Sequence, residues 1–321
     1  MSQTPLPDAK IVPFYLVSGA ENVAMIRGQV ASVGKVATTI LERHDYPLAI
    51  ASLQAEALAL AACLASTLKF DGVFTLQAKG DALVKTLFAD MTSQGNLRGY
   101  AAFDTDAKMP VEDDVATNAP ADVPALMGAG YIAFTVDQGA TGGRYQGIVD
   151  LDGATLSDAA TTWFANSEQL DTLVLAAAGK IDSGKIDSGK TGSGEWQATA
   201  MILQRIAADG GHNNAGDVAL SDDAWHTAKT LMQSVRHDEL VDPALGPEDL
   251  IFRLFNSMEP HVAPATDVRD QCRCSPQRFE TMLKQLDPAE IAELGDSDGF
   301  IDITCEFCKT NRRIAVDEFG G

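Results

Sequence analysis

The chain has 321 residues, 45% of them apolar, and a formal net charge of −21 at pH 7. Its length allows a substantial core and predicts roughly two domains, at about 100 to 200 residues each. So acidic a chain is unsuited to nucleic acid, because binding a polyanion depends on Lys and Arg displacing counterions. The segment from Asp267 to the end is also acidic, with seven Lys or Arg against twelve Asp or Glu.

The N-terminal sequence MSQTPLPDAK has neither a cationic start nor an apolar core, so we expect no export signal. We also expect no apolar run of about 18 residues, the length that a membrane helix needs. These features predict a soluble cytoplasmic protein without a membrane partner. In a reducing cytosol, close cysteine pairs indicate metal or redox chemistry more often than structural disulfides.

Alternating apolar residues and turn signals predict many short strands in the first two thirds of the chain. Two of them, 131–136 and 145–151, are expected to form a hairpin across the turn 138–144, which contains three glycines. The predicted strands are 11–17, 23–30, 72–78, 83–89, 97–103, 131–136, 145–151, 173–178 and 196–206.

Three helices are predicted among these strands. One covers 33–43, and one covers 156–169 with Ser157 as its N-cap. The third follows Pro47 and covers 48–68; it is rich in Ala and Leu, which predicts a buried helix. Cys63 lies within it and is interpreted as core packing. The acidic, Pro-containing stretch 104–124 is predicted to be an exposed loop.

The segment that follows is predicted to be a helical arm. Residues 209–217 are linker-like, Ser221 is expected to cap a helix, and a second helix is expected to begin at 246–249. The histidines of this half show no metal-like spacing and are interpreted as ordinary polar residues. Hairpins combined with a few long helices favour an α+β fold with a mixed-sheet N-terminal domain rather than an alternating α/β sheet.

Residues 179–193 consist of the tandem units GKIDS, GKIDS and GKTGS. Within them, 184–191 (GKIDSGKT) satisfies the phosphate-loop pattern, in which Lys190 would contact phosphates and Thr191 would bind magnesium. The context is unsuitable, because Gly192 and Gly194 stand where the helix of such a loop must begin. We therefore interpret 179–194 as a Gly/Ser/Lys insertion between two strands.

Four of the five cysteines lie in the last fifty residues. Cys272 and Cys274 form a CxC pair, and Cys305 and Cys308 form a CxxC pair. Two close pairs separated by a loop suit one tetrahedral zinc ion, because each pair supplies two thiolates from one tight turn. The sequence therefore predicts these four residues as the ligands of one zinc ion.

Between the pairs, the sequence predicts a helix over 276–286 capped by Ser275, a short helix over 288–294 and a strand over 300–304. Its expected apolar core is small and comprises Phe279, Leu283, Leu286, Ile291, Leu294, Ile301 and Ile303. Modules of about fifty residues rarely fold without disulfides, a bound metal ion or another stabilising cross-link, and zinc is the one available here.

Zinc binding in small Cys-rich modules contributes on the order of 10 to 16 kcal/mol. Whole domains are stable by only about 5 to 15 kcal/mol, so loss of the metal should unfold the module. Oxidation removes the thiolate lone pairs that hold the metal, and a disulfide within CxC would be strained and readily reduced. On spacing alone, an inert zinc staple and a reversible oxidant switch both remain open.

Several motifs in order make the chain similar to a known family. They are HDYP at 44–47, LKFDG at 68–72, RYQGIVDLDG at 144–153, SEQL at 167–170, IFRLF at 251–255, CRCS at 272–275 and CEFC at 305–308. Over essentially its whole length the chain resembles the 33-kDa heat-shock protein family, the redox-regulated holdase chaperones of bacteria.

The resemblance implies a holdase without ATP or enzymatic activity, inactive while reduced and bound to one zinc ion. It implies that oxidation pairs Cys272 with Cys274 and Cys305 with Cys308, releases zinc and unfolds the C-terminal region. The active form would bind unfolding client proteins and form a homodimer. The implied domains are an N-terminal chaperone domain (1–207), a helical linker arm (208–266) and a redox-sensing zinc module (267–321).

Two alternatives belong to other classes. A zinc-containing nucleotide hydrolase would use the 184–191 loop. A thiol-disulfide oxidoreductase would carry its CxxC on a βαβ unit, whereas this CxxC follows a strand near the end of the chain.

Overall fold

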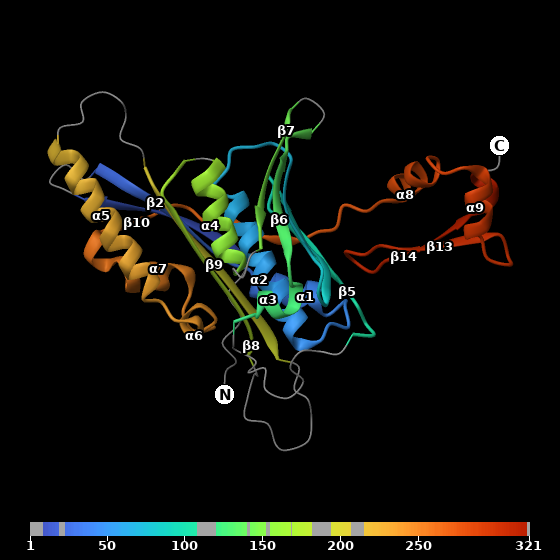
Figure 1. The fold of residues 1–321 in the computed structure, drawn as a ribbon, viewed down its shortest axis with the longest axis horizontal. Helices are drawn as coiled ribbons and strands as arrows, with labels where there is room; N and C mark the ends of the chain where they lie inside the picture. Colours follow the sequence, from blue (N-terminus) through green and yellow to red (C-terminus); the bar gives the residue numbers. More distant parts are fainter. Residues whose placement is uncertain are drawn as a thin grey trace, which may run out of the picture. The chain divides into compact units, whose positions relative to one another are not determined.

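A computed structural model describes residues 9–18, 23–107, 120–139, 142–151, 155–167, 169–181, 194–206 and 215–319 (Figure 1). The chain divides into two compact units, Met1–Asp270 and Gln271–Gly321, and each is described by itself. The phosphate-loop-like segment 184–191 and His212 lie outside the described residues. So do 108–119, most of the predicted exposed loop.

The first sheet of the larger unit is antiparallel and has the strand order β10-β1-β2-β9-β8, with β11 also paired to β1. Its long strands agree with the predicted ones, because apolar residues alternate along them with turn residues at their ends. The short strands β10 and β11 come from the far end of the arm and were not predicted. The bounds are β1 Lys10–Ser18, β2 Val23–Ser32, β8 Thr172–Ile181, β9 Glu195–Arg205, β10 Pro260–Val262 and β11 Thr266–Asp267.

The second sheet has the order β12-β5-β4-β3-β6-β7. The predicted hairpin is confirmed as β6 paired with β7, with Tyr131 opposite Asp150. Strand β12 runs parallel to β5 while the other neighbours are antiparallel, so the sheet is mixed, as predicted. The bounds are β3 Val73–Gly80, β4 Val84–Thr92, β5 Asn96–Phe103, β6 Gly130–Asp137, β7 Arg144–Asp150 and β12 Arg269–Asp270.

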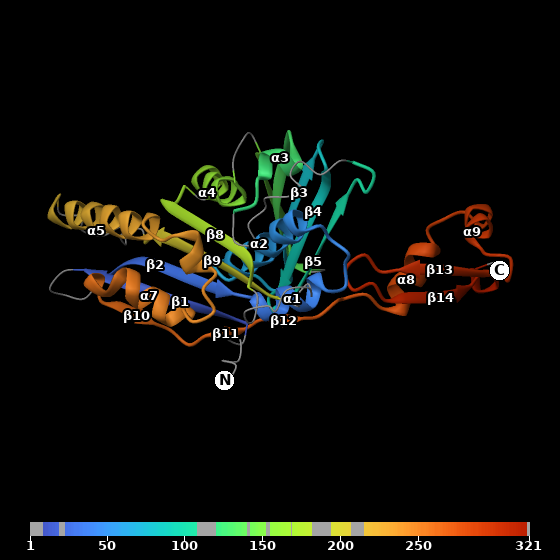
Figure 2. The same ribbon diagram turned by 90° about the horizontal axis from the view of Figure 1, so that it is seen from below.

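Helix α2 (Leu48–Ala65) lies between the two sheets (Figures 1 and 2) and is buried on all sides. Its alanines allow both sheets to pack closely against it. The neighbouring strand contributes Gly99, where a Cβ would lie 2.4 Å from Gln54 Nε2. The predicted buried helix is thus confirmed, and Cys63 is fully buried within it.

The prediction that no apolar run reaches about 18 residues is wrong. Helix α2 has 18 residues and is apolar enough to cross a membrane by length and composition. However, 89% of it is buried against the rest of the protein. Its composition is therefore that of a core helix enclosed by two sheets.

The buried residues of helices α1, α3 and α4 belong to the same core as α2. The arm helices α5, α6 and α7 cover the face of the first sheet that points away from α2 (Figure 1). Phe255 of α7 stacks on Phe14 of β1 with ring centroids 5.5 Å apart. The bounds are α1 Gly34–Leu41, α3 Val123–Met127, α4 Leu156–Ser167, α5 Ala215–Gln233, α6 His237–Leu240, α7 Pro247–Phe255 and the 3-10 turn η2 Asn256–Met258.

Two predicted helix caps are wrong. Thr155, not Ser157, caps α4: its hydroxyl accepts the backbone N–H of Asp158 at 3.1 Å, and the Asp158 carboxylate accepts the backbone N–H of Thr155 at 3.1 Å. Ser221 lies inside α5, which begins at Ala215. In both cases a polar residue inside the helix, in the first turn of α4 and about two turns into α5, resembled a start signal, because periodicity locates helix ends poorly.

The smaller unit contains α8 (Pro276–Leu283), α9 (Pro288–Leu294) and the antiparallel hairpin of β13 (Phe300–Thr304) and β14 (Asn311–Ala315), followed by the 3-10 turn η3 (Val316–Phe319). Ser275 caps α8 as predicted, accepting the backbone N–H of Arg278 at 3.3 Å. The unit buries Leu283, Ile291 and Ile301. Leu286 and Leu294 were predicted in this core but are 37% and 53% exposed, so the core is even smaller than expected.

Glu56 is a carboxyl group buried in the middle of α2. Burial, and secondarily the negative charge of Asp158, raise its pKa from 4.5 to about 8. The folded chain therefore keeps this proton over a pH range in which the unfolded chain releases it. Stability contributed by the neutral carboxyl is lost as pH rises from about 4.5 to about 8.

We predict that Glu56→Gln stabilises the reduced protein at pH 8 by on the order of a few kcal/mol, with a difference near zero at pH 4. Urea unfolding of the variant and the parent across this range measures the effect. The matched control is Glu42→Gln, which changes an exposed carboxylate and should give a small difference at every pH. A pH-independent gain in the Glu56 variant would contradict the assignment.

Candidate metal centre

The four predicted ligand cysteines come from two backbone segments of the smaller unit. Cys272 and Cys274 lie in the extended stretch that leads into α8, and Cys305 and Cys308 lie in the turn that joins β13 to β14. The register of that hairpin places Thr304 opposite Asn311, so the turn is held in a fixed position by the strands.

Backbone hydrogen bonds close the CxxC turn. The N–H of Cys305 donates to the Thr310 carbonyl at 3.0 Å, and the N–H of Lys309 donates to the Cys305 carbonyl at 2.8 Å. Lys309 has a φ of 54°, a left-handed conformation that is uncommon for a residue with a side chain. This tight turn directs both of its thiols to the same side.

The four Sγ atoms all lie within 4.8 Å of one another. The Sγ atoms of Cys272 and Cys305 are 3.8 Å apart, and those of Cys274 and Cys308 are 3.4 Å apart. A tetrahedral ion with metal–sulfur bonds of about 2.3 Å requires sulfurs about 3.8 Å apart. The four sulfurs and their spacing therefore fit one tetrahedral metal ion. Each of the two short contacts joins one sulfur of the CxC pair to one sulfur of the CxxC pair.

Backbone N–H groups point at the sulfurs, as they do around metal-bound thiolates. The N–H of Cys274 donates to Cys272 Sγ at 3.4 Å. The N–H groups of Cys308 and Phe307 donate to Cys305. Such bonds favour the ionised form of the sulfur, because a thiolate is the stronger acceptor.

Cys274, Cys305 and Cys308 differ in their readiness to ionise. Burial raises the pKa of Cys274 to about 12, assisted by its thiol neighbours, and burial also raises the pKa of Cys305. Burial opposes ionisation of Cys308 too, but hydrogen bonds from Thr310 lower its pKa to about 6. One thiolate thus forms readily at Cys308, whereas Cys274 and Cys305 need a cation nearby to offset the cost of burying their charge.

Solvent reaches most of this cluster. Cys305 is buried, whereas Cys272, Cys274 and Cys308 are half-buried. Oxidants of small size can therefore contact three of the four sulfurs. Cys63 differs, since it is fully buried in α2 and burial raises the pKa of its thiol to about 12, which makes it inert.

The sequence identified all four cysteines of the cluster but missed part of their support. Strand β14, with Ile314 packed against the small core, was not predicted, and neither was the role of Thr310. A polar residue two positions after CxxC was the available signal for Thr310. Among the described residues, the cluster consists of the four cysteines alone.

The sequence resembles one family along most of its length. The family model described as Hsp33 protein matches residues 15–315. A protein named 33 kDa chaperonin from Caulobacter vibrioides (strain NA1000 / CB15N) is 35% identical over 283 residues, 88% of this chain and 88% of that protein. A protein of the same name from Escherichia coli (strain K12 / DH10B) is 33% identical over 288 residues, 90% of this chain and 87% of that protein.

The fold also has a counterpart among solved structures. The crystal structure of the 33 kDa chaperonin (heat shock protein 33 homolog) of Thermotoga maritima superposes with a TM-score of 0.75, covering 98% of this chain and 97% of that one. Because only 19% of residues are identical, this likeness concerns the fold alone. It agrees with the predicted α+β class.

We predict that Cys→Ser substitution of any one of the four clustered cysteines weakens metal binding more than the roughly 10- to 100-fold caused by loss of a second-shell partner. The reason is that serine does not supply a thiolate to the ion. Competition with a chromophoric chelator measures the affinity. Cys63→Ala is the control and should leave the affinity unchanged; equal affinity in a cluster variant would contradict the assigned ligand set.

Proposed function

The chain belongs to the Hsp33 family of chaperones, and on that premise we propose that it is a redox-regulated holdase that works without ATP. The observation that carries the proposal is the four-thiol cluster in a unit that buries so few apolar side chains. The reduced, metal-bound protein is inactive in this proposal. Oxidation of the cluster activates it.

We assign zinc as the metal, held by Cys272, Cys274, Cys305 and Cys308. Four sulfur donors at this spacing suit zinc, which prefers tetrahedral thiolate sites and undergoes no redox change itself. When bound, zinc supplies positive charge that keeps all four sulfurs ionised. Ionised sulfurs are the nucleophiles that react with peroxide. The same site therefore both stabilises the C-terminal unit and responds to oxidants.

The oxidation step balances as a two-electron reaction in each pair. A thiolate attacks peroxide to give a sulfenic acid and hydroxide, and the second thiolate of the pair displaces hydroxide from that sulfur. We propose Cys272 with Cys274 and Cys305 with Cys308 as the resulting disulfides. The four sulfurs then have no thiolate lone pairs left for a metal.

Loss of the metal should unfold the C-terminal module, which we place at 267–321. Its buried core consists of Leu283, Ile291 and Ile301. A core this small contributes less to the free energy of unfolding than a bound metal does. A unit of this size is expected to have a small free energy of unfolding, so it should not stay folded without the metal. Unfolding is thus the direct consequence of oxidation.

Unfolding of the arm, which we place at 208–266, would expose a large apolar surface on the domain formed by 1–207. The arm covers β1, β2, β8 and β9 with its own apolar side chains. The buried sheet residues are Val12, Phe14, Leu16, Ile26, Val30, Ala177, Met201 and Leu203. A surface of this kind binds the apolar segments of unfolding proteins without sequence specificity.

Several further assignments follow from the family and from charge. We infer that the protein is cytoplasmic, has no enzymatic activity, binds unfolding proteins, and dimerises when oxidised. Its net charge of −21 argues against nucleic acid partners. Nothing in the described residues favours a nucleotide hydrolase, so we keep the chaperone as the proposed function.

Peroxide at raised temperature should release one zinc ion per chain and produce a several-fold gain in suppression of client aggregation without ATP. Zinc release is measured with a chromophoric chelator, and aggregation by light scattering. Cys63→Ala and Lys190→Ala are controls that should behave as the parent does. Zinc release without any gain in suppression would refute the holdase proposal.

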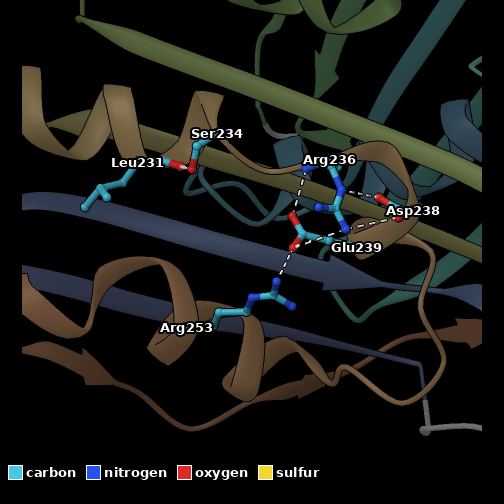
Figure 3. A network of polar contacts seen from close by, with 6 residues as sticks. All are labelled: Leu231, Ser234, Arg236, Asp238, Glu239 and Arg253. Carbon is cyan, nitrogen blue, oxygen red and sulfur yellow. Dashed lines mark hydrogen bonds and ion pairs between the residues drawn. The ribbon is translucent and has the colours of Figure 1, made fainter.

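A network of charged residues joins helices α6 and α7 of the arm (Figure 3). Glu239 of α6 accepts hydrogen bonds from the backbone N–H of Arg236 at 2.9 Å and from the guanidinium of Arg253 of α7. Its side chain is only 12% exposed, whereas that of Arg253 is 54% exposed. Glu239 is therefore the shared acceptor that joins the two short helices.

We predict that Glu239→Gln loosens the arm, because it removes the charge that both partners share. Amide exchange in α6 and α7 of the reduced protein should become roughly two- to fivefold faster, the range for a surface ion pair worth up to about 1 kcal/mol. Asp238→Asn is the control, since Asp238 is exposed and its ion pair is with Arg236, on the same helix end, rather than with Arg253 of α7. Equal exchange in the two variants would show that Glu239 does not join the helices.

A further inference from the structure

Strand β1 would be the edge of the first sheet but for a short segment that covers it. We call residues 260–270 the strap. Its strands β10 and β11 pair with β1, and its strand β12 pairs with β5, the corresponding edge of the second sheet (Figure 2). One segment thus closes an edge of both sheets.

The covered edge of β1 has properties that favour pairing of an exposed strand with another extended chain. Its sequence, KIVPFYLVS, is rich in aromatic and β-branched residues. Ile11 contacts the core between the sheets, while Val12, Phe14 and Leu16 contact the core beneath the arm. Pro13 offers only its carbonyl on this edge, and the remaining backbone groups of the long, apolar edge can pair with another extended chain.

The strap itself is a weak strand. It contains Pro260 and Pro264, which lack the N–H needed for pairing, and its strands are only two or three residues long. Val268 is its single buried side chain, all strap residues being described. An apolar segment without proline would form a longer ladder on β1 than the strap does.

The strap follows α7 and η2 at one end and leads to the first ligand cysteine at the other. Phe255 and Met258, just before it, pack into the core beneath the arm. Its last residue, Asp270, forms an ion pair with Arg43 and stands two residues before Cys272. Residues 260–266 of the strap belong to the arm and 267–270 to the module as placed above, so unfolding of the arm and the module would release the strap with them.

We propose that the oxidised protein releases the strap and that the freed edge of β1 binds extended segments of unfolded clients as an added β-strand. This rests on the proposed holdase function and names the chemistry of its partner. Backbone hydrogen bonds recognise any extended polypeptide, and the apolar side chains beside them favour apolar segments. A second copy of the chain is the alternative occupant, and the dependence of amide protection on protein concentration distinguishes it from a client segment.

The backbone geometry identifies the atoms that would bind. The carbonyls of Ala9 and Pro13 accept the N–H groups of Val268 at 2.9 Å and Ala263 at 2.8 Å. Alternate residues of a strand direct their polar groups to the same side, so the N–H groups of Ile11 and Tyr15 also face the strap. These two amides report whether the edge is covered.

The test uses the full-length protein and amide exchange resolved to single residues. The probe is a soluble peptide of alternating Val and Thr flanked by lysines, compared with the same peptide N-methylated at every second residue. Ile11 and Tyr15 should be protected in the reduced protein, exchange at least about tenfold faster after oxidation, and become protected again with the unmethylated peptide. The methylated peptide should bind at least about tenfold more weakly.

Two variants separate backbone pairing from side-chain contact at Tyr15, which is 43% exposed. Tyr15→Pro removes the N–H, and Tyr15→Ala keeps it while removing the ring. In the oxidised state, Tyr15→Pro should reduce peptide binding several-fold, and Tyr15→Ala should retain it. Circular dichroism of both reduced variants establishes that they fold.

Three results would overturn the inference. They are protected β1 amides after oxidation without peptide, protection that rises with protein concentration and so indicates a second copy, and equal binding of both peptides. Each of these leaves the proposed function intact if the oxidised protein still suppresses aggregation. Absence of suppression after zinc release would instead refute the proposed function itself.

Discussion

The contact among four sulfur atoms is the interaction on which the C-terminal unit depends. Its apolar core is small and its four sulfurs lie where they could hold one metal ion, so in the proposed function the folded state requires that metal. A cluster that is both essential to the fold and accessible to oxidants couples chemistry to folding directly. A larger core would remove that coupling, because the unit would then stay folded after oxidation.

The larger unit divides between a part that should persist and a part that is loosely held. Helix α2, enclosed by two sheets, gives the persistent part a continuous core. The arm adds short helices joined through Glu239, and the strap adds a few backbone hydrogen bonds. In the proposed function the arm and the strap are the elements that expose this surface, and both are held by the first sheet rather than by a core of their own.

Local sequence patterns predicted most elements because each depends on nearby residues. Alternation located the strands of both sheets, and the Ala-rich composition of α2 predicted its burial. Errors arose where local signals were ambiguous. Ser157 and Ser221 resembled caps but lie within helices, and the exposed Leu286 and Leu294 resembled core residues because apolar spacing does not reveal whether a partner faces them.

The spacing of the cysteines by itself determined the candidate ligand set, since two close pairs leave few arrangements for four thiolates. Only the tertiary structure decided which sulfurs are neighbours across the pairs, how Thr310 supports Cys308, and that the strap closes two sheet edges. Strap residues carry no strong strand signal, and their pairing partners lie more than 150 residues away in the chain. Such pairing is set by the position of completed sheets, which no local pattern encodes.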